Sequence, residues 1–424
     1  MAVRHVVLIG GATGREHAIA KHFARTKKYR LSVILWAENL FVRDLCNGEY
    51  HVIDLNDIDR VFNKIMEILP DYVIVGQGEV IQRGLKNMLN RVGIKCIAPT
   101  KEAAKIEGSK TYLRDLLSQK APDLNPKYKD FFKYSDKIKN YIQTFDDKVV
   151  IKCDGVIAGP RVRIYELPEQ LEEAVRNAER WIKDYGHIIV EEYIKGHEIA
   201  IMSFSDGVHL LHTPPFKNHK RINNGNVGEN TSGMGTIICD FSYMTEEIIK
   251  KLHAITEMIL EECNKSTDDL FIGSLYGEFL VCGNDIKVIE YNCRFGNPSS
   301  INMLAIMNVN FSEICEHILE GTIDKLNNVW SNRVCISAYI VPEKYMLDKE
   351  YVGTDLDFSR VDSELLYVGN VAYRDGRCIL KNSRALAVCA VGDTINETRE
   401  KVYSELQKIE GKIHYRTDIG LWEC

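Results

Sequence analysis

The chain lacks the features that mark membrane, secreted and nucleic-acid-binding proteins. None of its apolar runs approaches the roughly 18 residues that span a bilayer, and its start shows no charged leader followed by an apolar stretch. Basic residues are not in excess, because 54 Lys and Arg stand against 60 Asp and Glu, which gives a net charge of −6. No overall basic field therefore favours nucleic acid or an anionic membrane as a partner.

Closely spaced cysteine pairs are also missing. The 12 cysteines are scattered, with no Cys-x-x-Cys pair, and they fit buried thiols in a reducing cytosol better than a disulfide framework. We therefore expect a cytoplasmic protein. There is no internal repeat and no long low-complexity tract. With 424 residues, 45% hydrophobic and 27% charged, the chain is globular and long enough for two to four domains.

The most informative stretch is 285–298. Its apolar strand 288–291 carries Glu290, and Asn292 follows two residues later, so the two side chains point the same way. Mg²⁺ takes one or two carboxylates together with phosphate oxygens, and the guanidinium of Arg294 can grip a carboxylate or phosphate. This spacing predicts an enzyme that uses ATP on an anionic substrate. The alternative is a strand end with a surface ion pair.

The N-terminal part has an α/β pattern. A β-branched run at 6–9 leads into a glycine turn at 10–15 and a helical stretch at 17–25, the layout that lets backbone amides hold a phosphate. The glycines at 10, 11 and 14 do not match Gly-x-Gly-x-x-Gly, so a substrate phosphate is favoured over NAD, and a plain tight turn is the alternative. A parallel sheet is expected, with strands at 31–35, 72–76 and 94–98 and a helix at 57–69.

Two lysines are candidate nucleotide ligands. The stretch 99–118 predicts two short helices broken near Gly108, after which Lys110 can reach a phosphate or remain a solvated helix lysine. Lys152 ends the apolar strand 149–152, where a buried lysine needs a partner, and a phosphate would supply one. The intervening 120–147 is polar and predicts a connection with one helix. A further strand at 188–193 carries Glu191 and Glu192, with Glu198 beyond it, and suits a hinge that contacts adenine and ribose.

Motifs spread in order along nearly the whole chain resemble those of the ATP-grasp ligases, and within them the glycinamide ribonucleotide synthetase (phosphoribosylamine–glycine ligase) family. The resemblance implies that ATP phosphorylates glycine to an acyl phosphate, which the amine of 5-phosphoribosylamine attacks in purine biosynthesis. The motifs are 14–18, 99–110, 150–155, 191–198, 219–221, 230–235, 288–296 and 416–420.

The resemblance also implies roles for individual residues. ATP would contact Lys110, Lys152, Arg161, Glu191, Glu192 and Glu198. Mg²⁺, with Mn²⁺ as a possible substitute, would be held by Glu278, Glu290 and Asn292. Arg294 and Lys220 would be catalytic, and the small-molecule substrates, an amino acid and a phosphorylated sugar amine, would contact Gly14, Arg15, His219, Arg221, Asn230, Thr231 and Gly233. The basic run at 219–221 could equally be surface charge, and His17 is expected to pack or cap rather than act as a base.

Several departures from the family pattern leave alternatives open. The first loop has an extra residue, the segments 36–41 and 76–79 differ, Pro160 and Arg161 replace Lys-Gly, and carboxylates are missing at 223–232 and 297–299. The motifs expected to bind the nucleotide are retained, whereas those expected to bind the amino acid and the amine are altered. The chain is therefore a divergent member of the family, a paralogous ATP-grasp ligase with a different acid or amine, or a non-catalytic nucleotide-binding protein. It is expected to be a monomer or homodimer.

The expected fold is α/β. It has an N-terminal α/β (pre-ATP-grasp) domain at 1–103, an ATP-grasp core at 104–330 with a mobile subdomain at about 123–195, and a small mixed C-terminal domain at 331–424. Strands of the last part are expected near 334–341, 366–373 and 385–391, with a helix at 394–408.

Overall fold

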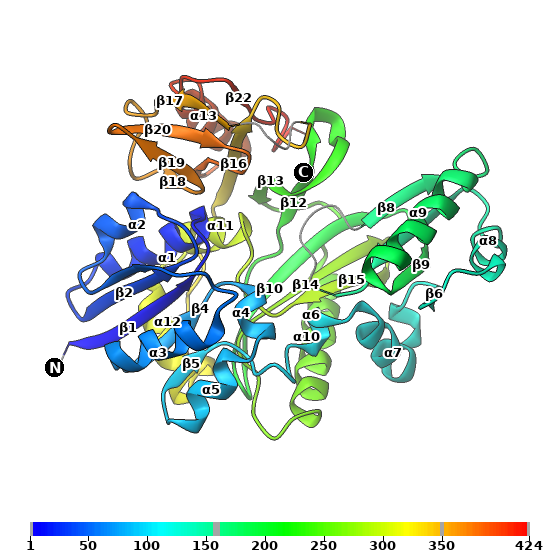
Figure 1. Ribbon diagram of the computed structural model, residues 1–424, viewed down its shortest axis with the longest axis horizontal. Coiled ribbons are helices and arrows are strands. Elements are labelled where there is room, and N and C mark those ends of the chain that lie inside the picture. Colours follow the sequence, from blue (N-terminus) through cyan, green and yellow to red (C-terminus); the bar gives the residue numbers. More distant parts are fainter. Residues whose placement is uncertain (1–2, 156–161, 348–351, 422–424) are drawn as a thin grey trace. The chain divides into compact units, whose positions relative to one another are not determined.

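The computed structural model describes residues 3–155, 162–347 and 352–421 (Figure 1). Its internal contacts divide the chain into two compact units. The first unit comprises Met1–Ala103, Ala200–Tyr276 and Cys293–Cys424, and the second comprises Ala104–Ile199 and Gly277–Asn292. The chain crosses from one unit to the other inside two long strands, β10 (His197–Asp206) and β14 (Ile272–Cys282).

A five-stranded parallel sheet opens the first unit, in the order β3-β2-β1-β4-β5. Of its two central strands, β4 is buried along its whole length and β1 is buried from Val6 to Gly10, as expected of a parallel sheet covered on both faces. The predicted strands and the helix at 57–69 are confirmed to within two residues. The elements are β1 (Arg4–Gly10), α1 (Gly14–Ala24), β2 (Tyr29–Leu35), α2 (Leu40–Leu45), β3 (Tyr50–Val52), α3 (Ile58–Ile68), β4 (Tyr72–Val75), α4 (Gly78–Gln82), α5 (Leu85–Arg91) and β5 (Lys95–Ile97).

The same unit contains an antiparallel sheet in the order β12-β13-β16-β21-β18, with β22 paired to β16, and a small sheet β17-β20-β19. The single strand expected at 366–373 is wrong, because Gly369 and Asn370 interrupt it and bond back to Ala385 and Arg384. The elements are β12 (Lys217–Asn223), η2 (Asn224–Asn226), β13 (Val227–Ile238), α10 (Glu246–Lys265), α11 (Ser299–Ala305), α12 (Phe311–Glu320), η3 (Ile323–Lys325), β16 (Val334–Pro342), β17 (Val352–Leu356), β18 (Leu366–Val368), β19 (Val371–Arg374), β20 (Arg377–Lys381), β21 (Leu386–Gly392), α13 (Ile395–Leu406) and β22 (Ile413–His414).

The second unit is built on a four-stranded antiparallel sheet in the order β6-β9-β7-β8. The two short helices broken at Ser109 are confirmed. The one helix expected within 120–147 is confirmed at 136–142, but the expected connection also contains a strand, because the charged segment Tyr-Lys-Asp-Phe pairs with β9 at the sheet edge as β6. The elements are α6 (Lys105–Gly108), α7 (Lys110–Lys120), η1 (Pro122–Leu124), β6 (Tyr128–Phe131), α8 (Asp136–Ile142), β7 (Lys148–Cys153), β8 (Val162–Glu166), α9 (Leu171–Tyr185) and β9 (Ile188–Glu192).

A further sheet has the order β11-β10-β14-β15 and carries the stretch that was most informative in the sequence. The expected strand at 288–291 lies inside β15 (Asp285–Asn292), which follows β14 after a short turn. The strand β11 (Leu210–His212) pairs antiparallel with β10 at the other edge.

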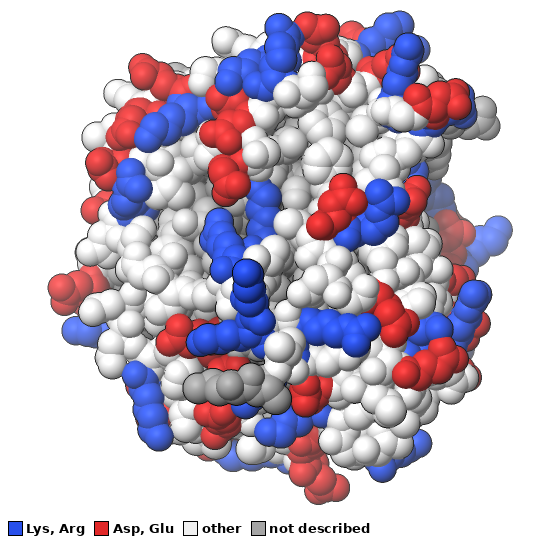
Figure 2. Space-filling model, turned by 90° about the vertical axis from the view of Figure 1, so that its left-hand side faces the viewer, with Lys and Arg blue, Asp and Glu red and all other residues white. Residues whose placement is uncertain are grey.

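The surface carries charges of both signs (Figure 2), as expected from a composition with similar numbers of acidic and basic residues. Figure 2 shows acidic and basic side chains interspersed on the face in view, with a small group of basic side chains near its centre. Within the described ranges, no helix has both the length and the apolar character needed to cross a membrane. Among the described residues, ten cysteines are free thiols, as expected in the absence of a disulfide framework, whereas Cys239 is disulfide-bonded.

Candidate active site

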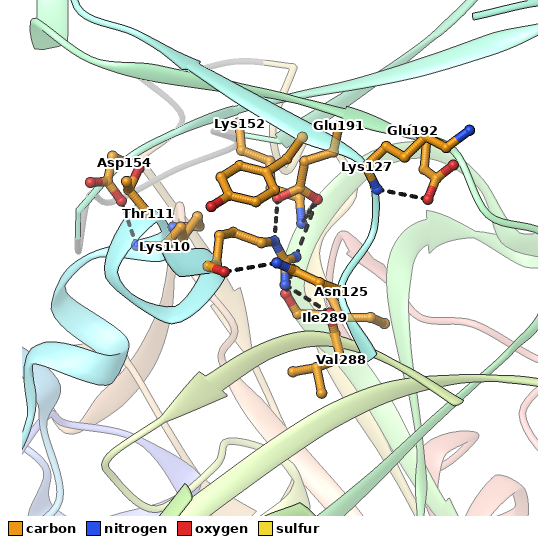
Figure 3. A network of polar contacts seen from close by, with 12 residues as sticks. Lys110, Thr111, Asn125, Lys127, Lys152, Asp154, Glu191, Glu192, Val288 and Ile289 are labelled. Carbon is orange, nitrogen blue, oxygen red and sulfur yellow. Dashed lines mark hydrogen bonds and ion pairs between the residues drawn. The ribbon is translucent and has the colours of Figure 1, made fainter. Parts of the chain in front are cut away.

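The core of the second unit's site is a buried ion network in which two cations share one carboxylate (Figure 3). The Glu191 Oε1 accepts from the Arg114 Nε at 2.8 Å, and Oε2 lies 3.2 Å from Nη2 of the same guanidinium. The Lys152 Nζ lies 2.6 Å from the same Oε2. All three side chains are at least nine-tenths buried.

Sheet register explains why Lys152 and Glu191 meet. In the antiparallel pair of β7 and β9, Val150 lies opposite Glu191, so Lys152 is the diagonal neighbour of Glu191 on the same face. Arg114 reaches them from α7, where its guanidinium also donates to the carbonyls of Val288 and Ile289 at 2.9 and 2.8 Å. The network therefore joins α7, β7, β9 and β15 at one point.

The electrostatics of this network leave positive charge in excess. Burial alone would raise the pKa of Glu191, but Arg114 and Lys152 outweigh it and lower this pKa to about 2. Burial lowers the pKa of Lys152, with Glu191 opposing the shift, Arg114 adding to it, and Glu290 also opposing it. Two buried cations for one carboxylate are incompletely compensated, and such a site favours an added anion.

Lys152 has a partner within the protein. The sequence predicted that a phosphate would pair this lysine, and among the described residues its Nζ pairs with the Glu191 carboxylate. Both oxygens of the Glu191 carboxylate contact Arg114 or Lys152. Its neighbour Glu192 lies on the opposite strand face, where its Oε1 accepts from the Lys127 amide at 2.7 Å. Glu198 is exposed at the start of β10.

Lys110 stands at the first residue of α7, beside the loop that follows β7. Ser109 caps the helix by accepting from the Tyr112 amide, and its hydroxyl donates to Asp154 at 2.9 Å. The Lys110 amide also donates to Asp154, and its Nζ donates to the Gly155 carbonyl at 3.3 Å. The start of α7 is thus tied to Asp154 and Gly155. The candidate residue Arg161, with Pro160, lies outside the described residues.

The candidate metal ligands lie in the second unit, on β14 and β15. Glu278 and Asn292 are each 7% exposed, and Glu290 is half-buried on the same strand face as Asn292. Glu290 is close enough to Lys152 for its charge to act on the pKa of that lysine. These residues supply hard oxygen donors, the kind that Mg²⁺ and Mn²⁺ take.

In the first unit, Arg15 and Glu16 form a buried ion pair at the start of α1. The Glu16 Oε1 lies 2.7 Å from the Arg15 Nε and 2.6 Å from its Nη2. The Arg15 Nη1 donates to the Phe295 carbonyl at 2.9 Å. A Cβ at Gly10 would lie 2.2 Å from the Glu16 Oε1, so the glycine turn makes room for this carboxylate.

Two residues that sequence reasoning missed make hydrogen bonds to candidate substrate residues of the first unit. The Tyr339 hydroxyl accepts from the Gly14 amide at 3.2 Å and donates to the Asn297 Oδ1 at 2.7 Å. Arg384 donates through Nη1 to the carbonyls of Ser232, Gly233 and Asn297, at 2.8, 3.0 and 2.8 Å. Neither residue belongs to one of the family motifs given above. The only sequence signal for Arg384 is that it ends the segment Lys-Asn-Ser-Arg just before a predicted strand.

The hairpin of β12 and β13 carries most of the remaining substrate candidates. Arg221 lies opposite Asn230, and the buried His219 lies opposite Gly235. The Thr231 hydroxyl donates to the Lys220 carbonyl at 2.8 Å and accepts from the Gly233 amide at 3.0 Å. The Asp418 carboxylate, paired with Arg416, also accepts from the Gly225 amide at 2.9 Å, so the C-terminal motif holds the tip of this hairpin.

The expectation for His17 is confirmed. Its side chain is buried and its Nδ1 accepts from the Val368 amide at 2.8 Å, while burial lowers its pKa to about 3. A neutral histidine whose Nδ1 is already bonded to the backbone packs the domain and does not act as a base.

Comparison with known proteins places the chain in a family. Models of the phosphoribosylglycinamide synthetase N domain, ATP-grasp (A) domain and C domain match residues 5–107, 108–300 and 333–422. Proteins named phosphoribosylamine–glycine ligase are similar over 98% of this chain and 96% of their own length, at 30% identity in Methanocella arvoryzae and 29% in Methanocaldococcus jannaschii.

Solved structures share the fold. The phosphoribosylamine–glycine ligase of Thermotoga maritima has a TM-score of 0.81 at 23% identity, covering 97% of this chain and 99% of its own. A biotin carboxylase domain from Hydrogenobacter thermophilus, solved with MgADP, has a TM-score of 0.73 at 14% identity, covering 98% and 92%. The α/β ATP-grasp fold expected from the sequence is confirmed. The chain therefore belongs to the phosphoribosylglycinamide synthetase family.

Proposed function

We propose that this chain joins glycine to 5-phosphoribosylamine in an ATP-dependent reaction of purine biosynthesis that passes through an acyl phosphate. The observation that carries the proposal is the buried Arg114–Glu191–Lys152 network, with two cations for one carboxylate and Glu290 nearby. Phosphoryl transfer depends mainly on positioning and on neutralising charge at the transferred group. A buried site short of negative charge suits the phosphates of a nucleotide.

The nucleotide would bind to residues of the second unit. Lys152 and Lys110 would contact its phosphates, with Arg161 as a further cation, and Glu192 and Glu198 would contact the adenosine part. Glu191 would act indirectly, because its carboxylate holds the Lys152 ammonium at 2.6 Å and so sets its direction. This positioning role adds to the expected place of Glu191 beside the adenosine part of the nucleotide.

Mg²⁺, or Mn²⁺ in its place, would be held by Glu278, Glu290 and Asn292. The donor set fits, because two carboxylates and one amide oxygen leave coordination positions for phosphate oxygens. When bound, the ion would supply positive charge against the phosphates. Lys152 would meet the same phosphates from the side of β7.

The substrates would be small molecules bound by residues of the first unit. Arg294 and Lys220 would be the catalytic cations, and the substrate-binding set would be Gly14, Arg15, His219, Arg221, Asn230, Thr231 and Gly233. We also propose domains at 1–103, 104–330 and 331–424, a monomer or homodimer as the assembly, and a cytoplasmic location.

Phosphate release tests the proposed reaction. We expect turnover of purified protein with ATP and Mg²⁺ only when both glycine and freshly made phosphoribosylamine are present. A panel of other amino acids and amines is the control. Turnover with another pair alone would indicate a paralogous ligase whose specificity lies in 223–232 and 297–299, and no ATP consumption with any acid would support the non-catalytic alternative.

A closing subdomain predicts protection from protease. We expect trypsin to cut the linkers of the subdomain at about 123–195 more slowly when ATP and Mg²⁺ are present, because lid closure shields an acyl phosphate from water. The cleavage rate is followed by gel electrophoresis and mass spectrometry. ATP with a chelator is the control, and equal cleavage rates in both conditions would contradict a closing lid.

A further inference from the structure

A histidine just before β9 is held by the protein on three sides. The His187 Nδ1 lies 3.1 Å from the Asp154 Oδ2, and its Nε2 lies 3.3 Å from the Thr111 hydroxyl. The Phe132 ring stacks on the imidazole, with the ring centres 3.9 Å apart. The His187 side chain is 15% exposed, so contacts with the protein rather than with water orient it.

These contacts also determine which ring nitrogen carries the proton. A carboxylate only accepts hydrogen bonds, so the His187 Nδ1 donates to Asp154. In the neutral ring the Nε2 accepts from the Thr111 hydroxyl, and in the charged ring it faces the Asp130 Oδ2 at 3.7 Å. The Nδ1–H therefore stays on Asp154 in both charge states.

Asp154 connects the imidazole to the start of α7. Its carboxylate accepts from the Ser109 hydroxyl at 2.9 Å and from the Lys110 amide, in addition to the His187 ring. The Asp154 amide donates to the His187 carbonyl at 3.3 Å, so these two residues are joined through both side chain and backbone. Lys110 begins α7, and Figure 3 shows it beside Asp154. A shift of the Asp154 carboxylate would thus move the first turn of that helix.

Asp154 also stands next to both lysines that we propose as phosphate ligands. Lys152 precedes it by two residues at the end of β7, and the Lys110 amide bonds to its carboxylate. Two cations can meet one polyphosphate only if their separation is right, and an error of about 1 Å in such an arrangement lowers the rate strongly. The group that fixes the Asp154 carboxylate therefore bears on nucleotide binding.

We propose that His187 is a positioning residue for Lys110. By donating from Nδ1 to the Asp154 carboxylate, it fixes where the first turn of α7 presents the Lys110 ammonium to the nucleotide phosphates. The inference rests on the proposed function, since it requires a nucleotide on Lys110, and it adds a residue that lies outside the family motifs given above. Its effect should fall on the nucleotide and not on the other two substrates.

Nucleotide binding tests the inference without requiring turnover. We expect His187→Ala to weaken the binding of ADP with Mg²⁺, measured by calorimetry, roughly tenfold, because a hydrogen bond to a charged group is lost. In turnover assays the same variant should raise the KM for ATP and leave the KM values for glycine and phosphoribosylamine unchanged. A histidine that serves only stability would lower the melting temperature and leave the ADP affinity of the folded protein unchanged.

Two further variants separate the ring nitrogens. The amide of His187→Asn places a donor near the Nδ1 position, so this variant should recover most of the ADP affinity. The longer His187→Gln places its amide near the Nε2 position and should not recover it. If His187→Ala does not fold, the comparison of these two variants decides.

A double-mutant cycle tests whether His187 acts through Asp154. In the Asp154→Ala background, adding His187→Ala should cost no further ADP affinity, because the shared contact is already gone. The matched control is His209→Ala, which removes a histidine paired with Asp206 at 3.0 Å in the first unit. It should bind ADP like the wild type.

Three results would overturn the inference: unchanged ADP affinity in a folded His187→Ala protein, equal affinities of the asparagine and glutamine variants, or additive losses in the double-mutant cycle. ADP binding that depends on His187 in a protein with no ligase turnover would leave this inference standing while the proposed reaction fails. A wild-type protein that binds no ADP would overturn both.

Discussion

Replacing Glu290 with glutamine is expected to abolish phosphate release. Glutamine keeps the size of the side chain but removes the negative charge that would hold a divalent cation against the nucleotide phosphates. We expect the turnover rate with ATP, glycine and phosphoribosylamine to fall at least about 10²- to 10³-fold. The measurement is steady-state phosphate release at saturating Mg²⁺, with thermal melting to verify that the variant is folded.

Asp285→Asn is the control for this variant. Asp285 is exposed at the start of the same strand, β15, so the substitution removes one carboxylate without touching the proposed metal ligands. It should keep the wild-type rate. A folded Glu290→Gln protein with more than about a tenth of the wild-type rate would contradict a metal-binding role.

Replacing Glu191 with glutamine is expected to destabilise the second unit strongly. The substitution leaves the Arg114 guanidinium and the Lys152 ammonium buried around a neutral amide. Breaking a buried ion pair in this way costs about 3–5 kcal/mol. Urea unfolding followed by intrinsic fluorescence measures the loss, with Trp181 of α9 as a reporter inside the unit's core.

The adjacent Glu192→Gln is the matched control. Its carboxylate accepts a hydrogen bond from the exposed Lys127 amide and has no part in the buried network. Its loss should cost only about 1 kcal/mol. Equal destabilisation by the two variants would mean that the network does not hold the unit together.

The same carboxylate predicts a pH dependence of stability. Arg114 and Lys152 lower the pKa of Glu191 from its ordinary value of 4.5 to about 2. A depressed carboxyl pKa contributes stability that is fully present above about pH 4.5 and is lost as the pH falls toward 2. We expect the wild-type unfolding free energy to drop by about 3 kcal/mol from this group across that window. Glu191→Gln should lack this part of the acid dependence.

Local sequence patterns were sufficient for most secondary structure and for the family. The β-branched runs of β1, β2 and β4, the break at Ser109 and the strand β15 are encoded by neighbouring residues, so they can be read without tertiary contacts. The motifs around Lys152 and Glu290 identified an ATP-grasp ligase, which the family models confirm. The edge strand β6 was missed because its charged segment has no hydrophobic alternation and depends on pairing with β9.

The charge partners, in contrast, were decided by tertiary structure. Arg114 and Glu191 are 77 residues apart, and Gly14 and Tyr339 are 325 apart, so their contacts depend on sheet register and chain crossover, which no local pattern encodes. The sequence by itself determined which residues could carry the chemistry. Only the folded chain decided that the Glu191 carboxylate pairs with Lys152 and that Arg384 donates to the carbonyls of Gly233 and Asn297, because a buried polar group takes whichever partner the packing brings within reach.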